Sequence, residues 1–130
     1  MSSLDRARLP DGEIATEINV EVRTLDDWLS GRPDINQQAA IVKIDVEGTE
    51  FSVLSGGHRF IAERRPQIIV EVAPDNRKRI FEFCKEIDYR IFQIREADHL
   101  ALDALNQNQF LGTLAATNFF MTAAERELPN

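Results

Sequence analysis

Cysteine is almost missing from this sequence, in which Cys84 is the single cysteine among 130 residues. One thiol excludes an internal disulfide and a cysteine-rich zinc site. Cationic residues are also in the minority, with 15 Lys and Arg against 22 Asp and Glu and a formal net charge of −7. Nucleic acids and anionic membranes are bound by clustered Lys and Arg, so we expect neither as a partner.

Long apolar runs, a signal-peptide core and glycine-rich loops are missing as well. No run approaches the roughly 20 apolar residues that span a bilayer, and "MSSLDRARLPDGE" at the start contains no apolar stretch. We therefore expect a cytoplasmic protein. The six glycines include neither a G-x-G pair nor a G-x-x-x-x-G-K-[ST] loop, which excludes the usual loops for dinucleotide, adenosine-cofactor and phosphate binding.

What the sequence does contain is an alternation of strand and helix patterns. Strands are predicted at 17–23, 39–46, 67–72, 89–94 and 117–123, and helices at 47–65 and 74–87. The second helix has an inward stripe, made of Ile80, Phe83, Cys84 and Ile87. This order predicts an α/β sheet in one domain over 1–130, with a loose start at 1–15.

Several residues predict where elements begin and end. Thr24 is a possible N-cap of a single helical turn, with Asp27 completing an approximate capping box. Gly56 and Gly57 predict a kink or break inside the first helix, and Asp88 a left-handed end of the second. A short helix is expected at 97–107.

The segment "IVKIDVEGTE" places ionisable residues at the end of a β-branched strand. With 41–47 as a strand, one face carries Val42, Ile44 and Val46, and the other carries Ile41, Lys43, Asp45 and Glu47. Ionisable groups on one strand face are costly unless that face is wet or the groups pair. Ligands in open α/β sheets bind beyond the carboxyl ends of strands, and Glu71 ends the next strand. We therefore expect Asp45, Glu47 and Glu71 to converge on one mouth.

A purely structural interpretation of these residues stays open. Residues 41–47 would then form an edge strand whose charged face meets water, and Glu71 would be a solvated strand end. His58, beside the double glycine, is expected at the surface, and Cys84, on an apolar stripe, in the core.

Two families share letters with this segment. "IDVEGTE" comes within one residue of the D-x-D-G-T motif of haloacid dehalogenase phosphohydrolases, a resemblance that would make Asp45 a nucleophile. Glu47 replaces the second Asp, however, "EVAP" stands where Ser or Thr is required, and no downstream Asp–Asp pair follows.

The longer match consists of "VRTLDDWL", "VKIDVEGTEFSVLSGG" and "RRPQIIVEV". In this order they closely resemble the second half of FkbM-type S-adenosylmethionine-dependent methyltransferases, over about residues 20–95, with "TNFFMTA" as the last strand. The resemblance implies a partial Rossmann-like (class I methyltransferase) sheet with flanking helices and an antiparallel strand near the C-terminus. The glycine loop of that class lies upstream of the matched part, so we expect the C-terminal half of a methyltransferase domain.

The resemblance also implies a reaction, methyl transfer from S-adenosylmethionine to a hydroxyl of a sugar, polyketide or peptide. Asp45 and Glu47 would lie at the methyl-transfer mouth, one as general base and one as an orienting carboxylate. Lys43 would offset their charge, and Glu71 would bind on the acceptor side. By analogy with catechol-type O-methyltransferases, Asp45 and Glu71 are also candidate ligands of Mg²⁺.

Two further expectations concern the chain as a whole. It is alternatively a non-catalytic remnant or interaction module that binds no cofactor. The strand at 39–46 would have an open edge in this chain, which predicts a homo-oligomer unless 17–23 folds back over that edge.

Overall fold

A computed structural model describes residues 18–94, 102–112 and 117–126 of the chain. Its centre is a five-stranded sheet in the order β1-β2-β5-β3-β4. The strands are β1 (Ile41–Ile44), β2 (Gln67–Glu71), β3 (Tyr89–Ile94), β4 (Leu102–Ala104) and β5 (Asn118–Ala123). The expected loose start at 1–15 lies outside the described residues.

The sheet is mixed. β1 and β2 are parallel, whereas β5 is antiparallel to both of its neighbours, β2 and β3. β4 continues the sheet antiparallel to β3. The predicted α/β sheet, with an antiparallel strand near the C-terminus, is therefore confirmed.

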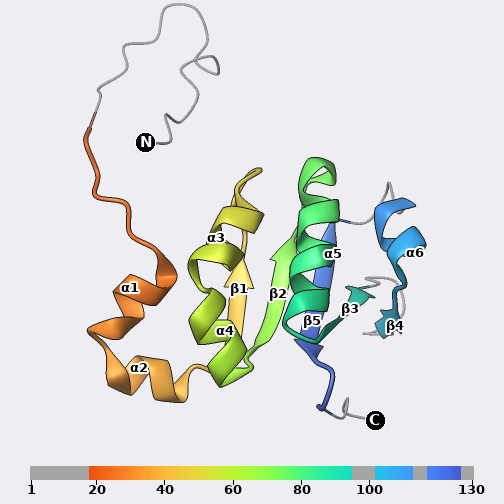
Figure 1. The fold of residues 1–130 in the computed structure, drawn as a ribbon. Coiled ribbons are helices and arrows are strands. Elements are labelled where there is room, and N and C mark those ends of the chain that lie inside the picture. Colours follow the sequence, from red (N-terminus) through yellow and green to blue (C-terminus); the bar gives the residue numbers. More distant parts are fainter. Residues whose placement is uncertain (1–17, 95–101, 113–116, 127–130) are drawn as a thin grey trace, which may run out of the picture.

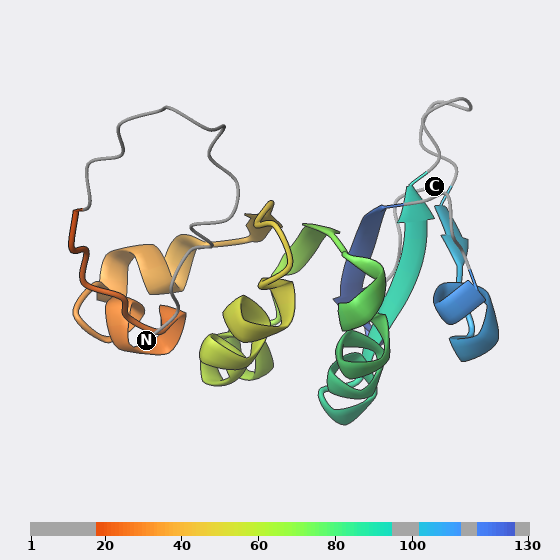
Figure 2. The ribbon, with the colours of Figure 1, turned by 90° about the horizontal axis from the view of Figure 1, so that it is seen from above.

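Helices accompany the sheet on one face. The helical elements are α1 (Leu25–Ser30), α2 (Pro33–Gln38), α3 (Glu50–Gly56), α4 (His58–Arg64), η2 (Pro74–Asn76), α5 (Arg77–Glu86) and α6 (Gln107–Gly112). Figure 2 shows α3, α4 and α5 on the same side of the sheet, with α1 and α2 beyond β1. None of the helices in the described ranges is long and apolar enough to cross a membrane.

The core lies between the sheet and these helices. Alternate residues of β2 and β5 are fully buried there, among them Ile68, Val70, Phe119 and Met121. From α5 the predicted stripe of Ile80, Phe83, Cys84 and Ile87 is buried against them. The helix ends as predicted, because Asp88 adopts a left-handed conformation with φ of 56°.

The predicted break at the double glycine separates α3 from α4. A Cβ atom at Gly57 would lie 2.8 Å from Leu25 Cδ2, so glycine lets α1 pack closely there. The Thr24 hydroxyl accepts from the Asp27 N–H at 3.1 Å, which confirms the predicted N-cap. Asp26 caps a different helix: its carboxylate accepts from the N–H of Phe60 in the first turn of α4 at 2.9 Å.

Arg65, the residue that follows α4, connects this helix to the segment after β5 through hydrogen bonds and an ion pair. Arg65, with φ of 54°, donates to Glu125 Oε2 at 2.7 Å and to the Asp88 carbonyl oxygen at 2.9 Å. It also donates to the Ile87 carbonyl oxygen and lies 4.7 Å from the centre of the Tyr89 ring. The Arg65 guanidinium lowers the pKa of Glu125 to about 2.

Two element predictions are wrong. Residues 18–23 are extended but pair with no described strand, because alternation indicates a strand without supplying its neighbour. The helix expected at 97–107 is also wrong: residues 95–101 lie outside the described residues, and 102–104 form β4 on the edge of β3. The helix α6 starts later, at a capping box in which Asn106 and Gln109 each accept the other's N–H at 3.0 Å.

Candidate functional site

The site begins where β1 ends. Ile44 is buried against the helices, whereas Lys43 and Asp45 are exposed on the opposite face, as the alternation predicts. Lys43 Nζ lies 3.1 Å from Asp45 Oδ2, and the two side chains are 69% and 58% exposed. Because the pair lies in water, it offsets charge but contributes little to stability. Within residues 18–94, 102–112 and 117–126, β1 is also the outermost strand of the sheet, so the edge-strand interpretation agrees with its position there.

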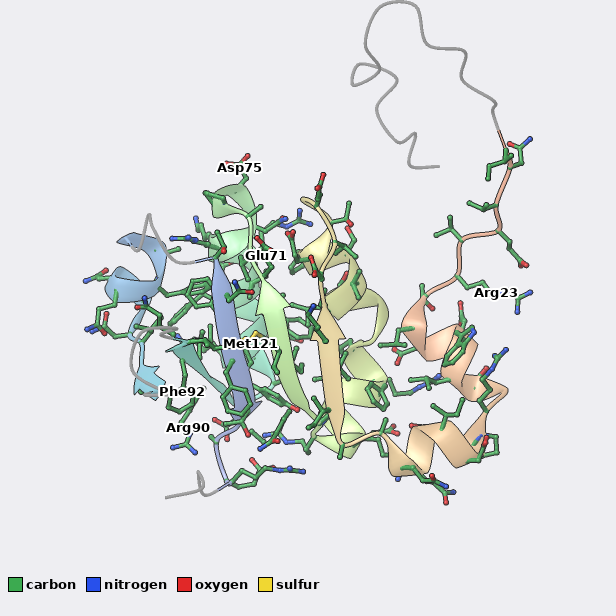
Figure 3. All side chains as sticks on the ribbon, turned by 180° about the vertical axis from the view of Figure 1, so that it is seen from behind. Arg23, Glu71, Asp75, Arg90, Phe92 and Met121 are labelled. Atoms are coloured by element: carbon green, nitrogen blue, oxygen red, sulfur yellow. The ribbon has the colours of Figure 1, made fainter. Side chains whose placement is uncertain are left out.

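The carboxylates of two neighbouring strands lie at the same end of the sheet. Asp45 follows Ile44, and Glu71 follows Val70, the parallel partner of Ile44. Glu71 is exposed, and Figure 3 shows it near the end of β2. Glu47 is exposed in the turn between β1 and α3. The fold therefore places these acids at one end of the sheet, and their convergence on one mouth stays a prediction.

Glu50 is a third acid of the same motif, and it is buried. Only 2% of it is exposed, although it begins helix α3. Its Oε1 atom accepts the Gly48 N–H at 2.8 Å, two residues back in the turn. Gly48 adopts φ of 80°, a conformation that favours glycine.

Asn76 completes a hydrogen-bonded clamp around Gly48. Its Nδ2 atom donates to Glu50 Oε2 at 2.5 Å and to the Gly48 carbonyl oxygen at 2.9 Å. Both backbone polar groups of Gly48 are thus held by side chains. Asn76 is 8% exposed and belongs to η2, which follows β2. The clamp therefore connects the turn after β1 to the segment after β2. It holds in place the backbone next to the exposed acids.

Neither clamp residue, Glu50 or Asn76, is predicted from the sequence. Glu50 had a visible signal, because it lies four residues before Leu54 and so shares the buried side of α3 with it. A carboxyl group on an apolar stripe requires a hydrogen-bond partner. Asn76 had no such signal, since its partners are 26 and 28 residues away in the chain.

The contacts of these residues bear on metal and cofactor binding. Within the described ranges no group of three or more His, Cys, Asp or Glu side chains is placed to hold a metal ion, so the Mg²⁺ site expected at Asp45 and Glu71 has no support. The Gly48 N–H, the group that a strand-to-helix loop would offer to a ligand, is occupied by Glu50. The turn after β1 therefore does not fit the role of an adenosine-cofactor loop.

The other reactive side chains agree with their structural interpretation. Cys84 is 1% exposed, and burial raises the pKa of its thiol far above the ordinary value, which makes it unreactive. His58 is partly exposed, with Nε2 3.3 Å from Glu86 Oε1 on α5 and its ring against Phe83.

The comparisons with known proteins give one result. The family model described as the methyltransferase FkbM domain matches residues 1–101. Neither the curated proteins nor the solved structures contain a match. The match includes the whole segment from β1 to β3, with the clamp and the exposed acids. It supports the FkbM resemblance over the phosphohydrolase resemblance, and the chain belongs to the methyltransferase FkbM domain family.

Proposed function

We propose that these 130 residues form the acceptor side of an S-adenosylmethionine-dependent O-methyltransferase. The proposal rests on one observation at the carboxyl ends of β1 and β2. There the buried clamp of Glu50 and Asn76 holds a turn that is flanked by exposed acids. The family supports methyl transfer in general. The parallel pair β1–β2 beside an antiparallel β5 supports a partial Rossmann-like sheet.

The exposed side chains have distinct roles in this proposal. Asp45 or Glu47 removes the proton from the acceptor hydroxyl as a general base, and the other carboxylate orients the hydroxyl. Lys43, 3.1 Å from Asp45, offsets the negative charge. Glu71 binds the acceptor from the neighbouring strand. Most of the rate enhancement then comes from positioning, which is why a turn held rigidly by buried side chains matters.

S-adenosylmethionine, the cofactor that the family implies, supplies the methyl group as an electrophile when it is bound. The sequence has no G-x-G spacing, and the Gly48 N–H is occupied. We therefore expect the isolated chain to bind S-adenosylmethionine weakly or not at all. Isothermal titration calorimetry measures this directly, and micromolar binding would contradict the expectation and require an adenosine site of another kind.

The acceptor class is tested by titration with hydroxyl compounds. The net charge of −7 favours neutral or cationic acceptors and disfavours nucleic acid. We would record backbone amide NMR spectra of the ¹⁵N-labelled chain during titration with a sugar, a polyketide alcohol and a serine peptide. Shifts at 43–49 and 71–76 that vanish in Asp45→Asn, but persist in the exposed-site control Asp34→Asn, would support the proposal. Shifts elsewhere, or none with any compound, would count against it.

A further inference from the structure

Asn118 begins β5 at the end of the sheet where the acidic residues lie. In the antiparallel pair of β2 with β5, its direct partner is Glu71. Residues directly opposite one another in an antiparallel pair share a face of the sheet, with Cβ atoms about 4.5–5.5 Å apart. This face also carries Lys43, because Lys43 pairs with Ile69, two residues before Glu71 on the same strand. Asn118 and Glu71 are therefore side-chain neighbours.

Asp45 lies level with this pair. It follows Ile44, the parallel partner of Val70, and Glu71 follows Val70. Asp45, Glu71 and Asn118 thus lie in a polar row at the ends of three neighbouring strands, β1, β2 and β5. Figure 3 shows Glu71 near the end of β2, the middle strand of the row. Since neighbouring strands lie about 4.8 Å apart, the row spans roughly 10 Å from β1 to β5.

The side chain of Asn118 is available to a ligand. It is partly buried, and its Nδ2 atom lies 3.5 Å from Thr117 Oγ1, at the limit of hydrogen bonding. A ligand oxygen at a shorter distance would replace this contact. Within the described residues no hydrogen bond joins Asn118 to Glu71, although the two are direct partners across the strands. The row thus contains a carboxamide whose donors are only weakly engaged by the described residues.

Asn118 adds to this row what the carboxylates lack. Ionised Asp45 and Glu71 only accept hydrogen bonds, whereas a carboxamide supplies two N–H donors. A donor at the reacting oxygen would weaken that oxygen as a nucleophile. The donors of Asn118 are separated from β1 by roughly 10 Å, so they suit a second group of the acceptor and not the hydroxyl that Asp45 or Glu47 deprotonates.

We propose that Asn118 binds the methyl acceptor at a second point, by donating to a carbonyl, ether or ring oxygen about 10 Å from the methylated hydroxyl. The inference rests on the proposed function, because it places Asn118 and the general base on one acceptor molecule. It makes acceptor length a requirement: a compound that reaches from β1 to β5 binds more tightly than one that occupies the β1 end alone. Asn118 lies outside residues 1–101, so the family match does not assign it this role.

Acceptors of two lengths test the proposal. Methyl glucoside and methyl maltoside differ by one sugar ring. N-acetylserine amide and a glycine pentapeptide with serine at its centre form a second pair. Amide NMR titration of the ¹⁵N-labelled chain gives a dissociation constant for each compound from the shifts at 43–49 and 71–76. We expect the longer member of at least one pair to bind about three- to tenfold more tightly, which is the effect of one added hydrogen bond.

Two substitutions assign this gain in affinity to Asn118. Asn118→Ala removes the amide, and Asn118→Asp keeps its shape but replaces the donors with a second acidic oxygen. Both are expected to lower the affinity for the longer compound to that for the shorter one, while the shorter compound binds as before. Asn19→Ala, which changes an exposed asparagine in the segment before α1, is the matched control and is expected to keep the full gain. Thermal melting verifies that each variant is folded.

The outcomes separate the inference from the proposed function. Equal affinities for the two lengths in both pairs would overturn the inference, as would a gain that survives either Asn118 substitution or that Asn19→Ala also removes. In each of these cases shifts at 43–49 and 71–76 would still support the acceptor site. If no compound shifts those residues, the proposed function fails and the inference fails with it.

Discussion

Removing the charge of Glu50 tests the clamp most directly. In Glu50→Gln the side chain keeps its shape and one oxygen that can accept the Gly48 N–H. Its new amide group faces Asn76 Nδ2, so two donors meet where 2.5 Å now separates a donor from an acceptor. If Asn76 turns its own amide to relieve this contact, the Gly48 carbonyl oxygen loses its donor. One of the three hydrogen bonds is lost in either arrangement.

The expected loss of stability follows from this count. A hydrogen bond to a charged group contributes about 1.5–3 kcal/mol when its partners are buried, so we expect Glu50→Gln to lower the free energy of unfolding by about 2 kcal/mol. For a chain of this size that corresponds to a melting temperature lower by roughly 6–12 °C. Thermal melting and urea denaturation measure both quantities.

A local measurement distinguishes the clamp from a general loss of packing. Hydrogen exchange of the Gly48 amide is expected to accelerate in Glu50→Gln more than exchange in β2. Glu63→Gln, the same substitution at an exposed position of α4, is the matched control and is expected to change stability by less than about 0.5 kcal/mol. The reasoning is refuted if Glu50→Gln melts with the unchanged protein and leaves Gly48 exchange as it was.

Three further predictions rest on other contacts. Arg65 lowers the pKa of Glu125 from 4.5 to about 2, so the stability gained from ionised Glu125 is present above pH 4.5 and is lost as the pH falls toward 2. Melting temperatures of the unchanged chain and of Glu125→Gln are therefore expected to converge over that pH range. Gly57→Ala places a methyl group 2.8 Å from a side-chain carbon of α1 and is expected to cost about 1–3 kcal/mol by urea denaturation, whereas Gly31→Ala, with no atom within 4 Å, is expected to be nearly neutral. The double variant Asp45→Asn/Glu47→Gln is expected to leave the melting temperature unchanged or to raise it, because exposed like charges are removed; a decrease of several degrees would show that these acids are structural.

Local sequence signals were sufficient to predict where most elements of this fold begin and end. Thr24 caps α1, the double glycine separates α3 from α4, and Asp88 ends the long helix, because each effect involves atoms within a few residues. The apolar stripe of α5 was equally readable, since helical periodicity alone determines which side faces the core. The family was also recognisable from the sequence, because its motif is a continuous run that includes Asp45 and Glu47.

Tertiary structure decided which elements meet. Residues 18–23 alternate as well as any strand in the chain, yet they pair with no described strand, because a strand requires a neighbour that its own sequence cannot specify. The segment 102–104 became β4 because β3 offered it an edge. The clamp joins Gly48 and Glu50 to Asn76 across 26 to 28 residues, and the parallel pairing of β1 with β2 is what brings their ends together. The sequence alone determined the chemistry present at each strand end, whereas long-range pairing decided which of those ends share a site.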